Sequence, residues 1–350
     1  MRTELTSGDV SVNQRYVASR RSQKELRRIY DNMEKMADRM NGRKYQFTKD
    51  ADTERLLGSK KGLGTLDVAG EFRKNIPVPD LSTVTWKNGA DINVRTPQDQ
   101  GTCVITGLNL LSPGLFLLTD HGNSCAKLVD ATTRTVTSRL ELPGRPWEVC
   151  ALPDDQAAVT LPVKSMIQLL STKEGQLSRG KEIKVSSGCR GIAYNNSRLY
   201  VSYASNPRIE VMTLDGLIIS KFQTVDGRQT FECSNYLTVS ASTPPTLYVS
   251  DFQANTVIQL SLDGKILREY SDKKLEYPES VVAVGPGQLL VCGYGSQNVM
   301  LLTERDGKMT EIMGRKDGLS PPYSVSFCPY TRTIVVGMRD NDSLKVFNAN

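Results

Sequence analysis

The feature that most constrains this 350-residue chain is a repeat with a period of about 43 residues. The clearest copies read RLYVSYASNPRIEVMTLDGLII from Arg198, TLYVSDFQANTVIQLSLDGKIL from Thr246 and QLLVCGYGSQNVMLLTERDGKM from Gln288. A fixed period of this length indicates an array of structural repeats. Six copies can be aligned in all, and each begins with an apolar run. The residue after that run is Asp120, Leu161, Tyr203, Asp251, Gly293 and Gly337 in turn, with spacings of 41, 42, 48, 42 and 44.

Each repeat predicts four antiparallel strands. A short apolar run precedes a turn, a second run leads to a polar bend, a third ends at Asp-Gly, and a fourth follows, as in Lys265–Tyr270. Asp215-Gly216 and Asp263-Gly264 predict two-residue hairpins, because both central positions of such turns favour positive φ. Six four-stranded copies favour a six-bladed β-propeller over a sandwich, which has no reason to repeat six times. The predicted fold class is all-β.

The predicted propeller spans residues 90–350. Its sixth copy reaches Asn350 just after its third strand, so the missing fourth strand must come from elsewhere in the chain. An open blade would leave an unpaired strand edge. We expect the stretch ADINVRTP (Ala90–Pro97) to supply the strand that closes the last blade.

The segment before the propeller carries a different periodicity. Its apolar residues are spaced by 3, 4, 3 and 4, the seam of a coiled coil. We therefore predict a helical, coiled-coil-like arm over residues 1–57 and a Gly-, Lys- and Pro-rich linker over residues 58–89. An amphipathic helix that packs on its own domain is the alternative. The predicted oligomerisation residues are Leu26, Ile29, Met33, Met36 and Met40.

Composition excludes several classes of protein. The chain has one histidine and seven cysteines without a Cys-x-x-Cys pair, which fits reduced thiols in a cytoplasmic protein better than disulfides or a zinc site. No apolar run approaches a membrane span, and the N-terminus lacks the apolar core of a secretory signal. Residues 1–80 carry 17 Lys/Arg against 12 Asp/Glu, and residues 81–350 carry 27 against 26. The near-neutral remainder argues against a broad phosphate-binding surface, and no DNA or membrane partner is expected.

Three stretches together resemble a known family. They are the coiled-coil seam, YQFTKDADTERLLGSKKGLGTLDV from Tyr45, and DINVRTPQDQGTCVITGLNLLSPGLFLLTDHGNSCAKLVD from Asp91. This order is similar to the C-terminal part of tripartite-motif proteins with NHL-type propellers, especially those of bivalve molluscs, and it covers the chain from about Ser22 to its end. The resemblance implies a role in ubiquitination, in which the propeller binds a protein partner or a ligase substrate.

The sequence also departs from that family. Full-length members begin with a RING domain and B-boxes, which are zinc modules built from close Cys/His sets. We expect the ligase module to be absent from this chain, which would then be a non-catalytic recognition protein without a cofactor. Self-association through the arm, or pairing with full-length relatives, is expected. Some relatives bind RNA, so an RNA-binding propeller is the main alternative.

The strands that open the blades begin at RPWEVC, GCRGIA, CSNYLT, YPESVV and PPYSVS, and they meet at one end of the predicted channel. Trp, Tyr and Arg are enriched at binding hot spots. We therefore predict that this end binds the partner. The predicted residues are Arg145, Trp147, Arg190, Asn235, Tyr236, Glu279 and Tyr323.

Signs of catalysis are few. His121 lies in the bend TDHGNS, and we expect it to be a solvent-exposed loop residue. Six-bladed propellers include calcium-dependent lactonases, so a metal-dependent hydrolase is the third hypothesis. Asp residues at a repeated bend are also explained by Asx-turns, without any metal. The oxygen ligands of the hydrolase hypothesis would be Asp120, Asp251, Asn235 and Glu279.

Overall fold

The computed structural model describes residues 43–48, 65–71, 78–225, 228–240 and 242–350. The chain divides into two compact units, Met1–Ile76 and Pro77–Asn350. In the first unit, β1 (Arg43–Thr48) pairs antiparallel with β2 (Thr65–Glu71). These strands correct the prediction of helix and linker at the two stretches, whose aromatic and β-branched residues favour extended backbone. The predicted coiled-coil seam, Leu26 to Met40, lies outside the described residues.

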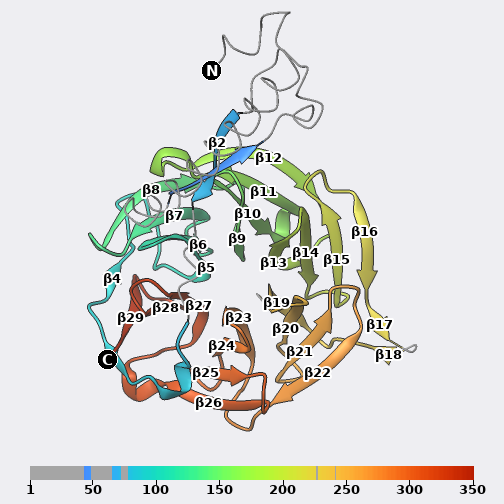
Figure 1. Ribbon diagram of the computed structural model, residues 1–350. Helices are drawn as coiled ribbons and strands as arrows, with labels where there is room; N and C mark the ends of the chain where they lie inside the picture. The colour runs from blue at the N-terminus through green and yellow to red at the C-terminus, as the bar shows by residue number, and fades with distance from the viewer. Residues whose placement is uncertain (1–42, 49–64, 72–77, 226–227, 241) are drawn as a thin grey trace, which may run out of the picture. The chain divides into compact units, whose positions relative to one another are not determined.

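The second unit is a six-bladed β-propeller (Figure 1). Five blades are four-stranded antiparallel sheets in sequence order, and the innermost strand of each borders the centre of the ring. Among the described residues, no helix combines the length and apolar character that a bilayer crossing requires. Blade 1 consists of β5 (Ile105–Ser112), β6 (Leu115–Asp120), β7 (Cys125–Asp130) and β8 (Thr135–Glu141). Blade 2 consists of β9 (Val149–Leu152), β10 (Gln156–Leu161), β11 (Met166–Ser171) and β12 (Ser178–Lys184). Blade 3 consists of β13 (Cys189–Asn195), β14 (Arg198–Tyr203), β15 (Arg208–Thr213) and β16 (Ile218–Phe222). Blade 4 consists of β19 (Ser234–Val239), β20 (Thr246–Asp251), β21 (Thr256–Ser261) and β22 (Ile266–Ser271). Blade 5 consists of β23 (Pro278–Gly285), β24 (Gln288–Gly293), β25 (Asn298–Thr303) and β26 (Lys308–Met313). Blade 6 contains β27 (Pro322–Cys328), β28 (Thr333–Met338) and β29 (Ser343–Ala349).

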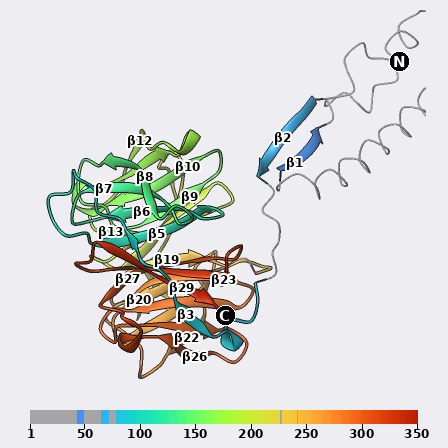
Figure 2. The same cartoon turned by 90° about the vertical axis from the view of Figure 1, so that its left-hand side faces the viewer.

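The last blade is closed by the segment that precedes the first. β4 (Ile92–Asn93) pairs with Ser343 and Leu344 of β29, which confirms the predicted closure. β3 (Trp86–Asn88) pairs with the far end of β29, as Figure 2 shows from the side. The closing segment therefore begins earlier than Ala90, and part of the predicted linker belongs to the propeller. Leu81, in the 3₁₀ turn η1 (Leu81–Thr83), is 1% exposed and donates its backbone N–H to the Gln288 side chain.

The core is divided among the spaces between the blades. Six clusters of buried apolar residues occur in the described part of the chain, one between each pair of neighbouring blades. The cluster between blades 6 and 1 includes Ile92 and Val94 of the closing segment beside Phe116 and Val335. Because each blade buries both faces against its neighbours, loss of any one interface would expose two apolar faces.

The turns differ in detail from the prediction. Gly216 and Gly264 have φ of 88° and 95°, whereas Asp215 and Asp263 keep negative φ. Ser261 and Lys265 bond across a three-residue loop, so these are hairpins with one left-handed glycine and not two-residue turns. The 48-residue spacing is explained by a small hairpin between blades 3 and 4, β17 (Thr224–Val225) with β18 (Arg228–Gln229).

Candidate functional site

One end of the propeller, which we call the mouth, is where each innermost strand begins and each second strand ends. The innermost strands of blades 1, 3, 4, 5 and 6 are irregular at this end, with register shifts such as those between Ile105 and Gly107 and between Pro322 and Ser324. A bulge redirects the side chain at which it occurs. The equivalent residues here, which we call the inner set, are Thr106, Trp147, Arg190, Asn235, Glu279 and Tyr323.

Hydroxyl groups from neighbouring blades fix the backbone of the inner set. Thr119 Oγ1 donates to the Trp147 carbonyl at 2.9 Å. Thr160 Oγ1 donates in the same way to the Arg190 carbonyl at 2.5 Å. Because each bond joins one blade to the next, the inner set is held by the ring as a whole.

A second group of equivalent residues follows the second strand of each blade. The backbone N–H of Phe252 bonds to the Cys233 carbonyl, that of Tyr294 to the Tyr277 carbonyl, and that of Arg339 to the Pro321 carbonyl. The same backbone link occurs at His121 and Ala204. This outer set comprises His121, Pro162, Ala204, Phe252, Tyr294 and Arg339.

Five aromatic side chains form a continuous row across the mouth. Tyr277 stacks on Phe252 with centroids 4.9 Å apart, and Phe252 lies 6.4 Å from Tyr294. Tyr294 lies 5.1 Å from Tyr323, which meets Trp147 edge-on at 5.9 Å. Tyr277 is 46% exposed and the other four are half-buried. The row crosses from blade 4 through blades 5 and 6 to blade 2, and it presents partly exposed apolar surface.

Beneath this row, buried polar groups join three blades. Arg190 donates from Nη1 to Asn235 Oδ1 at 2.6 Å, and Asn235 Nδ2 donates to Glu279 Oε2. Burial raises the pKa of Glu279 to about 8, although the Arg190 charge opposes this. Burial also raises the pKa of Glu148 well above its ordinary value. Near neutral pH the Glu279 carboxyl is therefore largely protonated, and burial likewise disfavours the charged form of Glu148, so the centre of the mouth carries little negative charge.

The structure brings the predicted partner-binding residues together at the mouth, but at different depths. Arg145 is exposed, and Trp147, Arg190 and Tyr323 are half-buried. Asn235, Tyr236 and Glu279 are at most 3% exposed, which corrects the expectation that they line an accessible surface. The Tyr236 hydroxyl donates at 2.7 Å to the Thr106 carbonyl on the far side of the ring. These three side chains support the mouth from below.

His121 also differs from its prediction. It is half-buried, its Nδ1 lies 2.9 Å from the Pro146 carbonyl, and its ring meets Trp147 edge-on at 5.4 Å. A carbonyl can only accept, so Nδ1 carries the hydrogen of this bond. Burial, together with the charges of Arg145 and Arg190, lowers the pKa of His121. His121 is therefore a neutral member of the mouth at neutral pH.

The residues that the sequence analysis missed have a common signal. Phe252, Tyr294, Arg339 and His121 each follow the end of the second strand, which the repeat alignment had already located. In the sixth repeat Met338, not Gly337, lies opposite Pro322 as Asp120 lies opposite Ile105. When the aligned position of the sixth repeat is moved from Gly337 to Met338, the residue that follows each aligned position is the outer-set residue of that blade. The outer set could therefore have been predicted from the repeat.

The oxygen ligands of the hydrolase hypothesis have other partners. Asp251 accepts hydrogen bonds from the backbone N–H groups of Glu232, Cys233 and Ala254, which confirms the Asx-type alternative there. Among the described residues, the one group with metal-ligand spacing is Asp99, Cys103 and Asp120. The Lys127 ammonium lies 2.7 Å from Asp99 and 2.8 Å from Asp120, with all three side chains fully buried. This ammonium already supplies the positive charge that a metal would bring.

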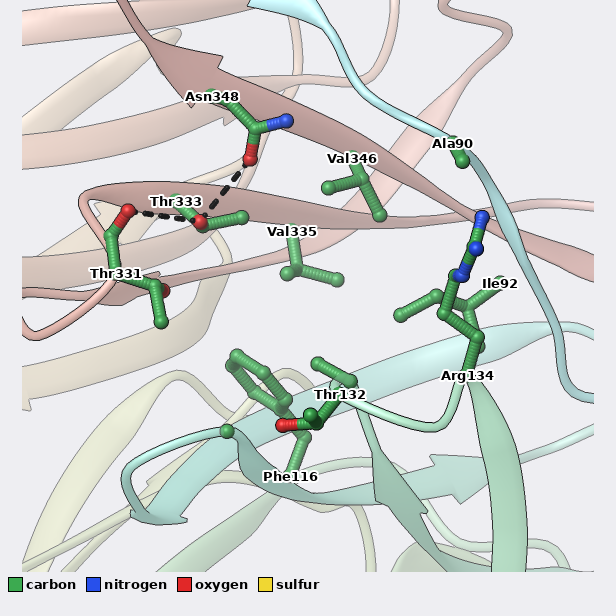
Figure 3. Close-up of a pocket in the computed structure, with 12 residues that line it drawn as sticks. Ala90, Ile92, Phe116, Thr132, Arg134, Thr331, Thr333, Val335, Val346 and Asn348 are labelled. Carbon is green, nitrogen blue, oxygen red and sulfur yellow. Dashed lines mark hydrogen bonds between the residues drawn. The ribbon is translucent and has the colours of Figure 1, made fainter.

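A separate cavity of about 360 Å³ lies between blades 1 and 6 (Figure 3). Phe116, Val335 and Val346 form apolar walls, and Arg134 lies at its edge. Its polar side is already bonded internally, because Thr333 Oγ1 contacts Asn348 and the Thr331 carbonyl, each at 3.2 Å. The cavity is bordered by the turns at the end of the ring opposite the mouth.

Comparison with solved structures supports the fold. The chain is similar to a streptogramin B lyase, with a TM-score of 0.56 and 14% identity over 76% of this chain and 98% of that one. A catalytically inactive histidine-to-alanine variant of virginiamycin B lyase from Staphylococcus aureus with quinupristin gives 0.53, with 16% identity over 75% and 99%. A structural genomics protein of unknown function from Bacteroides thetaiotaomicron gives 0.59, with 11% identity over 75% and 73%. No protein family model and no curated protein match the sequence. At these identities the similarity concerns the propeller fold alone.

Proposed function

We propose that the protein is a non-catalytic recognition module whose mouth binds a segment of a protein partner. The observation that carries this proposal is the row of five contacting aromatic side chains, partly exposed and drawn from four blades. Large, rigid aromatic side chains give much contact area for little loss of conformational entropy, and they dominate protein interfaces. A six-bladed propeller is consistent with such a scaffold.

The buried layer beneath the row supports the proposal. Asn235, Glu279 and Tyr236 are bonded within the ring, so the side chains above them rest on a fixed base. A pre-organised surface loses less entropy when it binds than a flexible one. The mouth is therefore suited to recognition of an extended segment without rearrangement.

The experiment is quantitative co-purification followed by affinity measurement. Proteins retained by the wild-type chain are compared with those retained by Tyr294→Ala, Tyr323→Ala and the control Leu217→Ser. Leu217 is 70% exposed and lies in the β15–β16 turn, away from the mouth. For a purified partner we expect each tyrosine variant to lose about 2 kcal/mol of binding free energy, as buried anchors do. Partners that bind all three variants as tightly as wild type would refute the proposal.

The family resemblance extends the proposal to ubiquitination in the cytoplasm. If the arm joins this chain to a complete tripartite-motif ligase, the partner at the mouth would be a substrate that this chain recruits to the ligase or withholds from it. Ubiquitination of the partner should then depend on Tyr294 and Tyr323 when a ligase relative is present. Ubiquitination that requires the ligase relative but is unchanged by Tyr294→Ala and Tyr323→Ala would show that the mouth does not recruit the substrate.

RNA binding is the second candidate, and three arginines at the mouth favour it: Arg145, Arg190 and Arg339. Arg339 is already paired with Asp340 at 3.2 Å, which weakens its claim as a phosphate ligand. Phosphate contacts release counterions, so RNA affinity would fall steeply with rising salt. A protein segment held mainly by aromatic contacts would show a shallow dependence. A steep slope that Arg145→Gln flattens would favour RNA.

A further inference from the structure

The positive charges of the mouth are concentrated at blades 2 and 3. Arg145 is exposed and makes no ion pair with a described residue. Arg190 is half-buried, its guanidinium lies 4.1 Å from the centroid of Trp147, and it too lacks a carboxylate partner within the described chain. At the mouth end of blade 3, by contrast, Arg208 is paired with Glu210 at 2.8 Å. The two arginines beside Trp147 are therefore available to an external anion.

The geometry of Arg190 leaves part of its hydrogen-bonding capacity unused. Only Nη1 donates a bond to a described residue, the one to Asn235. That bond and the stacking on Trp147 fix the plane of the guanidinium. Its remaining N–H groups can donate to a carboxylate or phosphate in the two-point arrangement that suits such anions.

The nearest acids do not cancel this charge. Glu279 and Glu148 are at most 8% exposed, and burial raises the pKa of each. His121, whose ring meets Trp147 edge-on, has its pKa lowered mainly by burial and further by the charges of Arg145 and Arg190, which is the response expected in a positive potential. This part of the mouth therefore attracts anions even though the propeller unit as a whole is neutral.

The other end of the aromatic row has the opposite character. Glu276 is exposed and directly precedes Tyr277. Glu232 is also exposed, and its backbone N–H bonds to Asp251, the residue before Phe252. Neither glutamate makes an ion pair with a described residue, so the mouth runs from two unpaired arginines, along the aromatic row, to two carboxylates that are unpaired within the described chain.

We propose that the mouth selects protein segments by an anionic side chain, a carboxylate or a phosphate, that binds Arg145 and Arg190 beside Trp147 while apolar residues of the segment lie along Tyr323 and Tyr294. The inference rests on the proposed function and specifies its partner. The direction of the segment follows from the charges, because its anionic end avoids Glu232 and Glu276.

The charge distribution favours a protein over RNA as the source of the anion. Residues 77–350 contain 27 Lys/Arg and 27 Asp/Glu, so this unit has no formal excess charge. An RNA strand that followed the aromatic row would bring successive phosphates towards the two glutamates. One anionic side chain needs only the local pair of arginines.

The test begins with a random 12-residue peptide library selected on the immobilised full-length chain. Selected peptides are then measured in solution by fluorescence polarisation against wild type, Arg190→Gln, Arg190→Lys, Arg145→Gln and the control Arg305→Gln. Arg305 is exposed in the β25–β26 turn, at the end opposite the mouth. Thermal melts show whether each variant is folded. If the Arg190 variants do not fold, Arg145→Gln still tests the inference, because Arg145 is exposed.

We expect selected peptides to share an acidic residue near an aromatic or aliphatic one. Arg190→Gln should weaken binding at least tenfold and Arg145→Gln about threefold, whereas Arg305→Gln should have no effect. Arg190→Lys should be intermediate, because it keeps the charge and loses the planar fork. Peptides with phosphoserine or glutamine at the acidic position then separate phosphate from carboxylate recognition, and glutamine should abolish the dependence on Arg190.

The alternative outcomes are distinguishable. One such outcome is that the selected peptides contain no acidic residue, bind more weakly when Tyr294 or Tyr323 is replaced, and bind equally well when either arginine is replaced; this result would overturn the inference and support the proposed function. Peptides that ignore the tyrosines, or a selection that yields none, would overturn both. A random-sequence single-stranded RNA that displaces the peptides, with a steep salt dependence, would overturn the choice of a protein segment.

Discussion

At the scale of single residues, the inner set shows how one repeated position acquires different roles. Glu279 and Arg190 occupy equivalent places in different blades, yet one is buried and the other is half-exposed. The difference matters for charge, because burial disfavours the ionised carboxylate of Glu279 while Arg190 remains a cation. The protonation of Glu279 should therefore be visible in the stability of the fold.

We predict that Glu279→Gln makes stability less dependent on pH. The pKa of Glu279 is about 8 in the folded protein, against an ordinary value of 4.5. Between these values the folded state binds the proton more tightly, so wild-type stability falls as pH rises, by up to about 1.4 kcal/mol per pH unit. Glutamine cannot ionise and can still accept the bond from Asn235.

The measurement is the melting temperature of both proteins from pH 5 to pH 8.5. The advantage of the glutamine variant should grow across this window and level off above pH 8. His121 titrates in both proteins, so its contribution cancels in the difference. A difference that is the same at every pH would show that Glu279 is ionised throughout.

Lys127 offers a second test at the residue scale. Lys127→Met should leave the carboxylates of Asp99 and Asp120 buried without their shared ammonium, with only Arg139 still 3.2 Å from Asp99. Breaking a buried pair in this way typically destabilises a protein by about 3–5 kcal/mol. The matched control is Lys181→Met, because Lys181 pairs with Asp215 in solvent. Chemical denaturation should show a large loss for the first variant and little change for the second; equal losses would contradict the structural role of Lys127.

At the scale of elements, the repeat predicted the strands well because the apolar runs of strands buried on both faces and the turn residues between them act locally. The closing strand was also predictable, since an unpaired edge in the last blade demanded a partner. Contacts across the ring were not predictable: Tyr236 reaches the Thr106 carbonyl over 130 residues of sequence separation. Which side chains meet there depends on the number of blades and on the bulges, and no single repeat carries that information. Three of the seven predicted mouth residues are buried for this reason.

The closing segment leads to the third prediction. A chain that begins at Gln98 lacks β3 and β4 and loses Ile92 and Val94 from the core between blades 6 and 1. A chain that begins at Pro77 keeps these elements and the contacts of Leu81. Removal of even one such buried side chain costs about 2 kcal/mol or more. We expect the shorter chain to melt far below the longer one or to remain unfolded. Equal melting temperatures would refute closure by this segment.

At the scale of the whole molecule, charge divides the chain into two parts. Residues 1–76 carry 17 Lys/Arg against 11 Asp/Glu, an excess of six, whereas residues 77–350 are balanced. Non-specific attraction to nucleic acid should therefore come from the first part, and selectivity from the mouth of the second. Binding experiments with the full chain need a comparison with residues 77–350 before any RNA signal is attributed to the propeller.

The last prediction concerns the first part of the chain and rests on its sequence. The 3-4 spacing of Leu26, Ile29, Met33, Met36 and Met40 predicts self-association, because about two heptads are marginal for an isolated helix and need a partner surface. Two carboxylates on the seam, in Leu26→Asp with Met33→Asp, should prevent that association and leave the melting of the propeller unchanged. Light scattering should show an assembly for wild type and a monomer for the variant. If the chain associates, several mouths are linked and a multivalent partner gains avidity, so the variant should bind such a partner more weakly while its affinity for a single peptide stays the same. A wild-type chain that is already monomeric would remove both the assembly and the avidity.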